Sequence, residues 1–522
     1  MLINSLSFIA FIILLLIIYA VIPKKIKWVV LLLASYIFYF LNSTKLIVCI
    51  LLTTLSIYIV GLLMGKVDDK VKDNINKLEN KEEKKKIKSK AKATKKKILT
   101  VGILFNLGIL ILMKYTGLIN EIFSVNIPIL TLALPLGISY YTLQAISYIV
   151  DVYRQKIKPD KNLGRLALFL AFFPQLIEGP IGRYDRLANQ LYEAHKITFN
   201  NLRSGFSLML WGYFKKMVIA DRVAIFVNAI FGNFSEYTGP IVFVAILGYT
   251  LQIYAEFSGG IDIVRGVSEL FGINLEKNFE NPFFAKSIDE FWRRWNITLG
   301  TWLKEYVFYP VSLSKFSMKV NSISSKIFKK SYLTKIIPVA VSLLCVWICN
   351  GLWHGAGIKY IVYGLYYYSI MMLGKILAPF GEKIIKTLKI NTQAWSYKLW
   401  QIIRTGLIVC FGMLIFRAET LNVAWEMFKS IFKLTGLNLL LTGQGFLIGG
   451  LEEKDLLILA IGVVTIFITS LLKEKGIKLR EKLFEQNLVF KWGLLYTIIL
   501  AILVFGIYGV GYDVQSFIYG QF

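Results

Sequence analysis

Histidine and cysteine are scarce in this chain of 522 residues, which has two histidines, His195 and His354, and four cysteines. The cysteines, at positions 49, 345, 349 and 410, lie inside apolar segments, without the spacing of a metal site or a disulfide framework. A structural or catalytic zinc site needs a cluster of cysteine, histidine or carboxylate ligands, and a lone histidine does not supply one. We therefore expect no bound metal.

Other motifs are also missing. The sequence has no glycine-rich phosphate-binding loop and no Gly-x-Ser-x-Gly elbow, so a kinase-like enzyme and a serine hydrolase are both disfavoured. Acidic residues are few: 32 against 60 lysines and arginines, for a net charge of +28. The basic residues fall between apolar segments, as the positive-inside rule predicts for a membrane protein. This placement indicates contact with membrane lipid and argues against nucleic acid as a partner.

Long apolar runs are the dominant feature that is present. Hydrophobic residues make up 56% of the chain, and runs of about 20 residues, long enough to cross ~30 Å of hydrocarbon, recur throughout. The sequence predicts an all-α polytopic membrane protein with about 10 to 12 transmembrane helices plus re-entrant segments. The first run, residues 2–22, lacks a basic start and a cleavage site, so we expect no cleavable signal.

Two basic regions predict the orientation. Residues 66–97 contain 14 lysines and 6 acids and cannot bury a core, so we expect a solvated helix or a flexible loop in the cytoplasm. Residues 277–335, which include the sequence FWRRWN, form a second predicted cytoplasmic or re-entrant region. Counting crossings from these regions places both termini outside. We found no second domain, so one integral-membrane domain is predicted over residues 1–522.

The apolar run at residues 166–181 is interrupted. It contains Pro174, Glu178, Gly179 and Pro180. Prolines and a carboxylate in such a run predict a broken or re-entrant segment that lines protein or water and avoids lipid. Glu178 is therefore a candidate for binding substrate.

His354 follows the mostly apolar residues 336–353. Ionisable groups inside a membrane are costly to retain and are functional candidates for that reason. With its near-neutral pKa, an imidazole can act as general base on a hydroxyl. The alternative is a histidine at a helix end that finds water or a backbone carbonyl. Trp353, the residue before it, could form one wall of a pocket or could simply pack against a neighbouring helix. His195 lies in a polar segment, and we expect it to be on the surface.

A second polar cluster lies upstream. In it, Asn296 could orient a substrate or polarise a carbonyl. The alternative for the charged members is a satisfied salt-bridge network at the cytoplasmic interface. The cluster consists of Glu256, Asp262, Asp289, Glu290, Arg293, Arg294 and Asn296.

Several segments, in order along most of the chain, resemble the membrane-bound O-acyltransferase family, in particular its bacterial branch of polysaccharide O-acetylation and teichoic-acid D-alanyl transfer proteins. The similar segments are LPLGISYYTLQAISYIVDVYR (134–154), FFPQLIEGPIGRYDRL (172–187), the segment from AEFSGG to EYVFYP (255–310), NGLWHGAG (350–357), LIFRAE (414–419) and FIYGQF (517–522).

The resemblance implies a ring of tilted helices around a thinned centre, with a tunnel from each face. It implies that His354 is catalytic and that a second polar position, usually histidine in this branch, lies within FWRRW-x-I, where this chain has Asn296. We take His354 and Asn296 as the candidate catalytic residues. The substrate-binding candidates are Arg293, Arg294, Trp295, Trp353, Glu178 and Asp262.

The predicted activity is transfer of an acetyl group across a bacterial cell membrane to a cell-surface or secreted glycan. The resemblance implies acetyl-CoA or an acyl carrier protein as donor, no bound cofactor, and a secreted or membrane-anchored acetyltransferase- or esterase-like partner. Two alternatives remain open. One is D-alanyl transfer to teichoic acid from a carrier protein. The other is a non-catalytic transporter or acyl conduit in which His354 gates or relays protons.

Overall fold

The computed structural model describes residues 3–125, 127, 135–329, 331–433 and 435–508. Within these residues the chain is helical and contains no strand, apart from one isolated antiparallel bridge between Phe279 and Trp295. The FIYGQF segment (517–522) lies outside the described residues.

The chain divides into two compact units. The first comprises Met1–Phe206 and Val264–Glu276, and the second comprises Ser207–Ile263 and most of Lys277–Tyr519. Helices α10 and α12 each run from one unit into the other. The single membrane domain expected for residues 1–522, and the ring arrangement of its helices, stay predictions.

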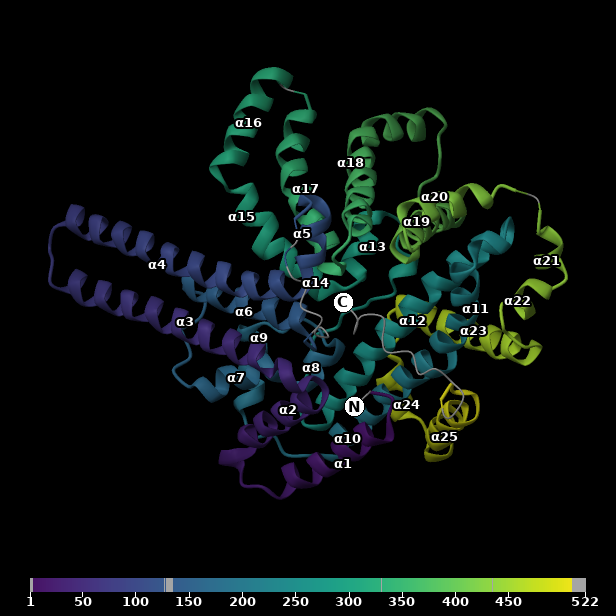
Figure 1. Cartoon of the computed structure of the whole chain (residues 1–522), viewed down its shortest axis with the longest axis horizontal. Coiled ribbons are helices and arrows are strands. Elements are labelled where there is room, and N and C mark those ends of the chain that lie inside the picture. Colours follow the sequence, from purple (N-terminus) through teal and green to yellow (C-terminus); the bar gives the residue numbers. More distant parts are fainter. Residues whose placement is uncertain (1–2, 126, 128–134, 330, 434, 509–522) are drawn as a thin grey trace. The chain divides into compact units, whose positions relative to one another are not determined.

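The first unit is built largely from antiparallel helices at the N-terminal end of the chain. Helices α3 and α4 form a long hairpin that extends well beyond α6 (Figure 1). The helices of this unit are α1 (Leu6–Val21), α2 (Lys27–Ser43), α3 (Ile47–Asn76), α4 (Lys81–Leu110), α5 (Thr116–Phe123), α6 (Ile138–Tyr153), α7 (Leu163–Ala171), α8 (Phe173–Glu178) and α9 (Tyr184–Tyr192), with the short helices η1 (Lys24–Ile26), η2 (Thr44–Leu46) and η3 (Ile111–Tyr115).

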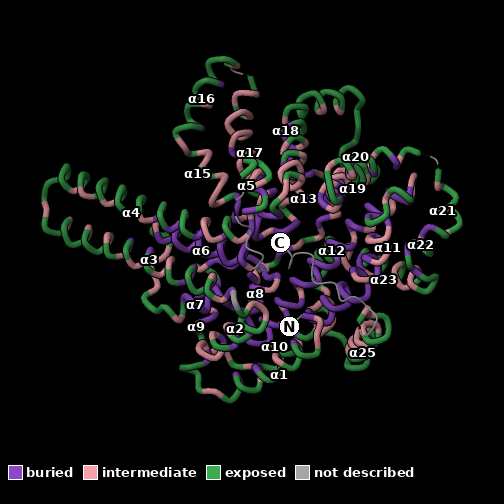
Figure 2. Tube along the Cα trace, viewed as in Figure 1, coloured by how far each residue is buried: buried purple, intermediate pink, exposed green. Residues whose placement is uncertain are grey.

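The basic run at residues 66–97 is helical on both sides of a short turn. The far ends of α3 and α4 are exposed in Figure 2, as expected for a solvated helix. Lys95 donates hydrogen bonds of 2.7 and 3.0 Å to Asp68, which joins the two helices. Asn80 caps α4 by accepting a hydrogen bond from the backbone N–H of Glu82.

The second unit contains the rest of the chain, including most of α10 and α12. Its helices are α10 (Phe199–Tyr213), α11 (Asp221–Gly232), α12 (Pro240–Leu270), α13 (Ile288–Arg294), α14 (Ile297–Leu303), α15 (Tyr309–Ser312), α16 (Lys315–Phe328), α17 (Leu333–His354), α18 (Ile358–Thr387), α19 (Trp395–Arg417), α20 (Leu421–Ser430), α21 (Leu437–Leu441), α22 (Gln444–Ile448), α23 (Glu453–Glu474), α24 (Leu479–Glu485) and α25 (Leu488–Phe505), with η4 (Phe214–Ala220), η5 (Phe234–Glu236), η6 (Pro282–Phe284) and η7 (Lys304–Phe308).

Nine helices among the described residues are long and apolar enough to cross a membrane, and α1 is a shorter apolar helix. The chain is therefore an all-α polytopic membrane protein, and these ten helices match the lower end of the predicted number. The nine are Lys24–Ser43, Ile47–Asn76, Lys81–Phe123, Pro240–Leu270, Leu333–His354, Ile358–Thr387, Trp395–Arg417, Glu453–Glu474 and Leu488–Phe505.

The predicted break near Pro174 is confirmed. Helix α7 ends at Ala171, the chain turns at Phe172, and Pro174 lies in the first turn of α8, where a missing N–H costs nothing. Gly179 continues in an extended conformation. The Gln175 side chain crosses the turn that follows and donates a hydrogen bond of 3.1 Å to the carbonyl of Pro180.

Candidate active site

His354 is the last residue of α17, and its side chain is buried. Only 2% of the residue is exposed. Its ring lies edge-on to three aromatic rings, with centroid distances of 4.9 Å to Trp353, 5.1 Å to Phe416 and 5.5 Å to Tyr363. Helices α17, α18 and α19 therefore enclose the imidazole in a largely apolar environment.

Two glycines allow α17 and α18 to pack backbone against backbone. A Cβ atom on Gly351 would collide with the carbonyl oxygen of Tyr360, and a Cβ atom on Gly364 would collide with the carbonyl oxygen of Trp347. Close approach of this kind is what small residues provide between membrane helices. It sets the position of Tyr363 against His354.

The FWRRWN segment forms α13 and the start of α14. Ser287 caps α13 by accepting a hydrogen bond of 3.2 Å from the N–H of Glu290. The chain then turns at Asn296, whose φ of 44° lies in the left-handed region. Asparagine adopts this region more readily than most residues because its short polar side chain can bond locally.

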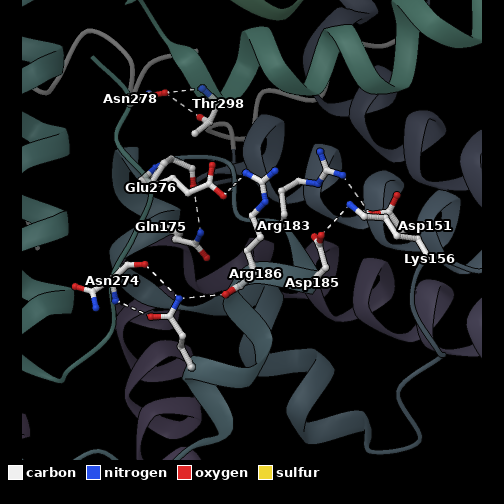
Figure 3. Close-up of polar contacts among 12 residues, drawn as sticks. Asp151, Lys156, Gln175, Arg183, Asp185, Arg186, Asn274, Glu276, Asn278 and Thr298 are labelled. Carbon is white, nitrogen blue, oxygen red and sulfur yellow. Dashed lines mark hydrogen bonds and ion pairs between the residues drawn. The ribbon is translucent and has the colours of Figure 1, made fainter. Parts of the chain in front are cut away.

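The Asn296 side chain is held at one end. It is 4% exposed, and its oxygen accepts a hydrogen bond of 3.0 Å from the amide of Asn278. Asn278 in turn accepts hydrogen bonds from the N–H and the hydroxyl of Thr298, at 3.0 and 2.9 Å (Figure 3). The NH₂ group of Asn296 has no hydrogen-bond partner among the described residues. A buried donor of known direction is thus available to a substrate.

Trp292 connects FWRRWN to the surroundings of His354. Its ring centroid is 5.0 Å from Trp347 and 4.8 Å from Tyr367. It also lies 6.4 Å from Tyr363, the residue that contacts His354. One continuous aromatic cluster therefore joins the segment that carries Asn296 to the ring of His354.

The other residues of FWRRWN differ in their surroundings. Trp295 is 1% exposed and packs against Phe279 and Phe291, so it belongs to the aromatic core. Arg294 pairs with Glu474 at 2.9 Å and is the arginine of the predicted salt-bridge network. Arg293 is exposed and forms no ion pair among the described residues, so its guanidinium is accessible.

The three remaining substrate-binding candidates differ in their contacts. Asp262 on α12 accepts a hydrogen bond of 2.8 Å from Lys215. Glu178 ends α8 in the first unit and is 1% exposed. Trp353 lies beside His354, as its position in the sequence requires.

Sequence reasoning missed two buried lysines of the second unit. Lys215 and Lys216 lie in the π-helical segment η4, and the ammonium of Lys216 is 2.8 Å from Glu256 and 2.7 Å from Asp221. One apolar run contains two lysines and the next contains two acids. Because charges inside a membrane pair with one another, this pattern could have predicted that the lysines and the acids contact each other.

A polar network surrounds residues 183–186 in the first unit (Figure 3). Lys156 lies 2.8 Å from Asp185, and Arg186 lies 2.9 Å from Glu276. Burial alone would raise the pKa of the Asp185 carboxyl, but Lys156, followed by Arg183 and Arg186, lowers that pKa below its usual value. These ion pairs join α9 to Lys156, earlier in the chain, and to Glu276, later in the chain.

No group of three or more histidine, cysteine or carboxylate side chains that could hold a metal ion occurs in the part of the chain that the structure describes. His354 offers an imidazole between aromatic walls, and Asn296, in the segment that Trp292 joins to this cluster, offers a buried amide donor. These groups suit proton transfer from a hydroxyl and stabilisation of a developing oxyanion.

Comparison with known proteins gives three kinds of relative. The chain is 35% identical over 299 residues to a "probable alginate O-acetylase" of Pseudomonas syringae, and the matched region covers 57% of this chain and 52% of the relative. It is 29% identical over 377 residues to a "peptidoglycan O-acetyltransferase" of Helicobacter pylori (66% and 67%). It is 29% identical over 296 residues to a "teichoic acid D-alanyltransferase" of Bacillus subtilis (54% and 69%).

The chain spans about half to two-thirds of the length of these curated relatives. The model of the membrane-bound O-acyltransferase family matches residues 158–328, which include α13 and Asn296. The resemblance predicted from the sequence is confirmed: the chain is similar to membrane-bound O-acyltransferases, by the family model over residues 158–328 and by these relatives.

Proposed function

We propose that this chain is an O-acyltransferase that moves an acetyl group from a cytoplasmic donor across the membrane for O-acetylation of a cell-surface or secreted polysaccharide. The observation that carries the proposal is the buried His354 imidazole, joined through Trp292 and Tyr363 to the segment that presents the Asn296 amide. Relatives named for alginate and peptidoglycan O-acetylation support a glycan acceptor.

The reaction assigns a role to each polar group. The donor is a thioester, acetyl-CoA or an acyl carrier protein. His354 takes the proton of the accepting hydroxyl, whose oxygen forms the new ester bond to the acyl carbon. The NH₂ group of Asn296 donates a hydrogen bond to the carbonyl oxygen as negative charge develops on it. The carbon–sulfur bond breaks, and the proton held by His354 passes to the leaving thiolate.

The remaining parts of the proposal concern placement and partners. The chain would lie in a bacterial cell membrane with both termini outside, since the basic hairpin of α3 and α4 would then be cytoplasmic. A secreted or membrane-anchored acetyltransferase- or esterase-like protein would complete delivery to the glycan. Arg293, the exposed arginine of FWRRWN, would contact the anionic donor.

A second candidate is D-alanyl transfer to teichoic acid, which the Bacillus subtilis relative favours. The same base and amide donor would serve that reaction because it also forms an ester at a hydroxyl. The two proposals differ in the acyl group found on the glycan.

His354→Ala tests the proposal. Ester-linked acetate and ester-linked D-alanine are measured on the cell-surface glycan, together with the amount of protein in the membrane. His195→Ala is the matched control, because the imidazole of His195 contacts the carbonyl of Gln190, at 2.7 Å, in the first unit. Loss of acetate only in His354→Ala supports the proposal, and loss of D-alanine supports the second candidate. Unchanged esters in correctly inserted His354→Ala would overturn the histidine-base mechanism and favour the conduit.

A further inference from the structure

Helix α16 (Lys315–Phe328) carries large apolar side chains on its outside. Phe316, Ile323 and Ile327 are 64%, 46% and 64% exposed, and their spacing along the helix places them in one apolar stripe. The buried positions of the helix are instead two serines, Ser317 and Ser324, which are 2% and 3% exposed. A helix on the surface of a water-soluble protein has the reverse arrangement, with apolar residues buried and polar residues exposed.

The serine side of α16 faces α17 (Leu333–His354). The two helices pack against each other as a hairpin (Figure 1), and Ser317 borders the same cavity as Thr334 and Pro338 of α17. Helix α17 is long and apolar enough to cross a membrane. Contacts between membrane helices are built from small residues such as serine, while their apolar side chains face the lipid. Helix α16 therefore has the arrangement expected of a helix that lipid surrounds.

The length of α16 and its position place it at the surface of the membrane. It has 14 residues, whereas a helix that crosses needs about 20 apolar residues. It ends at Phe328, and α17 begins at Leu333, so α16 is held beside one end of a membrane-spanning helix. A short amphipathic helix in this position lies at the boundary between lipid head groups and acyl chains.

A row of lysines adjoins the apolar stripe. Lys315, Lys319 and Lys326 are exposed, and their spacing along the helix aligns them in a second row. Helix α16 contains no acid, and these lysines form no ion pair among the described residues. Positive charges beside an apolar stripe are complementary to negative head groups above hydrocarbon, which is the chemistry of an anionic phospholipid surface.

We propose that α16 is a docking surface for anionic phospholipid. Its apolar stripe lies among the acyl chains, and its lysine row binds the negatively charged head groups. Each lysine near an anionic surface favours binding about fivefold, so the row selects anionic over zwitterionic lipid. The proposal concerns lipid binding alone and does not depend on the proposed reaction.

A photo-crosslinking residue on the apolar stripe identifies what covers it. Phe316 is replaced by p-benzoylphenylalanine in the full chain, which is reconstituted in vesicles of equal parts phosphatidylglycerol and phosphatidylcholine and illuminated. The mass of the crosslinked peptide identifies the captured lipid. The matched control places the same residue at Val464, which is 54% exposed in the middle of the membrane-spanning helix α23. A triple variant, in which Lys315→Gln, Lys319→Gln and Lys326→Gln are combined, removes the lysine row.

At position 316 we expect at least about fivefold more adduct with phosphatidylglycerol than with phosphatidylcholine. The ratio of the two adducts should fall towards one in the triple variant and should be near one at position 464 in both proteins. Added salt should lower the ratio at position 316, because salt screens exposed charges. The melting temperature of the triple variant should match that of the parent, because the three side chains are exposed.

Three results would contradict the proposal. Absence of any lipid adduct at position 316 would show that the apolar stripe faces water. Equal capture of the two lipids by the parent, or the same preference in the triple variant, would overturn the selectivity assigned to the lysine row. In intact cell membranes, an adduct with the mass of a protein in place of lipid would show that a protein partner covers the stripe.

Discussion

The side-chain oxygen of Asn296 accepts a hydrogen bond of 3.0 Å from the amide of Asn278, and this contact decides which end of the Asn296 amide is available. Asn278 is itself oriented, because its own oxygen accepts from both the N–H and the hydroxyl of Thr298. The three residues therefore present a donor, and not an acceptor, at the buried end of Asn296.

Asn278→Asp should reverse that orientation. One carboxylate oxygen can keep the hydrogen bonds from Thr298, while the other would face the Asn296 oxygen and attract its NH₂ group instead. The amide would flip and present an acceptor to the substrate. We expect kcat to fall by about 10²- to 10³-fold, the usual cost of losing one oxyanion donor. Initial rates of acetyl transfer by purified protein measure the effect.

Two controls separate the flip from loss of folding. The melting temperature of Asn278→Asp should fall, because the new carboxylate is buried without a cation, so the transfer rate is expressed per folded molecule. Asn296→His should remain active, since histidine tolerates the left-handed backbone and offers a ring N–H. Undiminished transfer by Asn278→Asp would show that the NH₂ group of Asn296 is not used.

The contact between α17 and α18 gives a second prediction. A Cβ atom on Gly364 would collide with the carbonyl of Trp347, so Gly364→Ala should force the helices apart and displace Tyr363 from His354. We expect a destabilisation of about 1 to 3 kcal/mol and a loss of transfer activity. The measurements are the melting temperature in detergent and the activity per folded molecule.

Gly374 is the matched control on the same helix. A Cβ atom there would meet nothing within 4 Å, so Gly374→Ala should be neutral or should stabilise by up to about 1 kcal/mol, because alanine favours a helix more than glycine does. Equal effects of the two substitutions would contradict the role assigned to the close approach of α17 and α18.

The sequence could predict these helices but not most of their partners. Apolar length located the spans, and Pro174 located the break between α7 and α8. By contrast, Lys215 contacts Asp262 across 47 positions of sequence, and no local pattern specifies such a pairing. The sequence also did not predict the surroundings of Trp295, which is buried against Phe279 and Phe291; its role in binding substrate stays a prediction.

The ion pair between Lys156 and Asp185 predicts a pH dependence of stability. Since the pKa of Asp185 is lower in the folded chain than its usual value, the carboxylate stabilises the fold above about pH 4, and this contribution is lost as the pH falls through the folded pKa. Asp185→Asn should lower the melting temperature at pH 7, and the difference from the parent should shrink as the pH is lowered below about 4. The difference should be at most about 1 kcal/mol, because Lys156 is 41% exposed. A difference that stayed the same from pH 7 down to the lowest pH at which the protein remains folded would contradict the ionic explanation.

Lys216 gives the largest predicted effect on stability. Its side chain is fully buried, and its ammonium lies 2.7 Å from Asp221 and 2.8 Å from Glu256. Lys216→Met would leave the buried Glu256 carboxylate and the mostly buried Asp221 carboxylate without their shared cation, so we expect a loss of about 3 to 5 kcal/mol. Lys216→Met combined with Glu256→Gln should recover part of that loss, because one of the two charges is then removed. Thermal unfolding in detergent and the amount of protein in the membrane measure both variants.

Lys475→Met is the control for removing one positive charge, because Lys475 is exposed just after the end of α23. Its effect should stay within about 0.5 kcal/mol, as for most surface substitutions. If Lys216→Met were as mild as this control, the cluster would have to be hydrated, because only water could replace the ammonium as the partner of both carboxylates. If the double variant were less stable than Lys216→Met, the Glu256 carboxylate would be stabilised by groups other than Lys216.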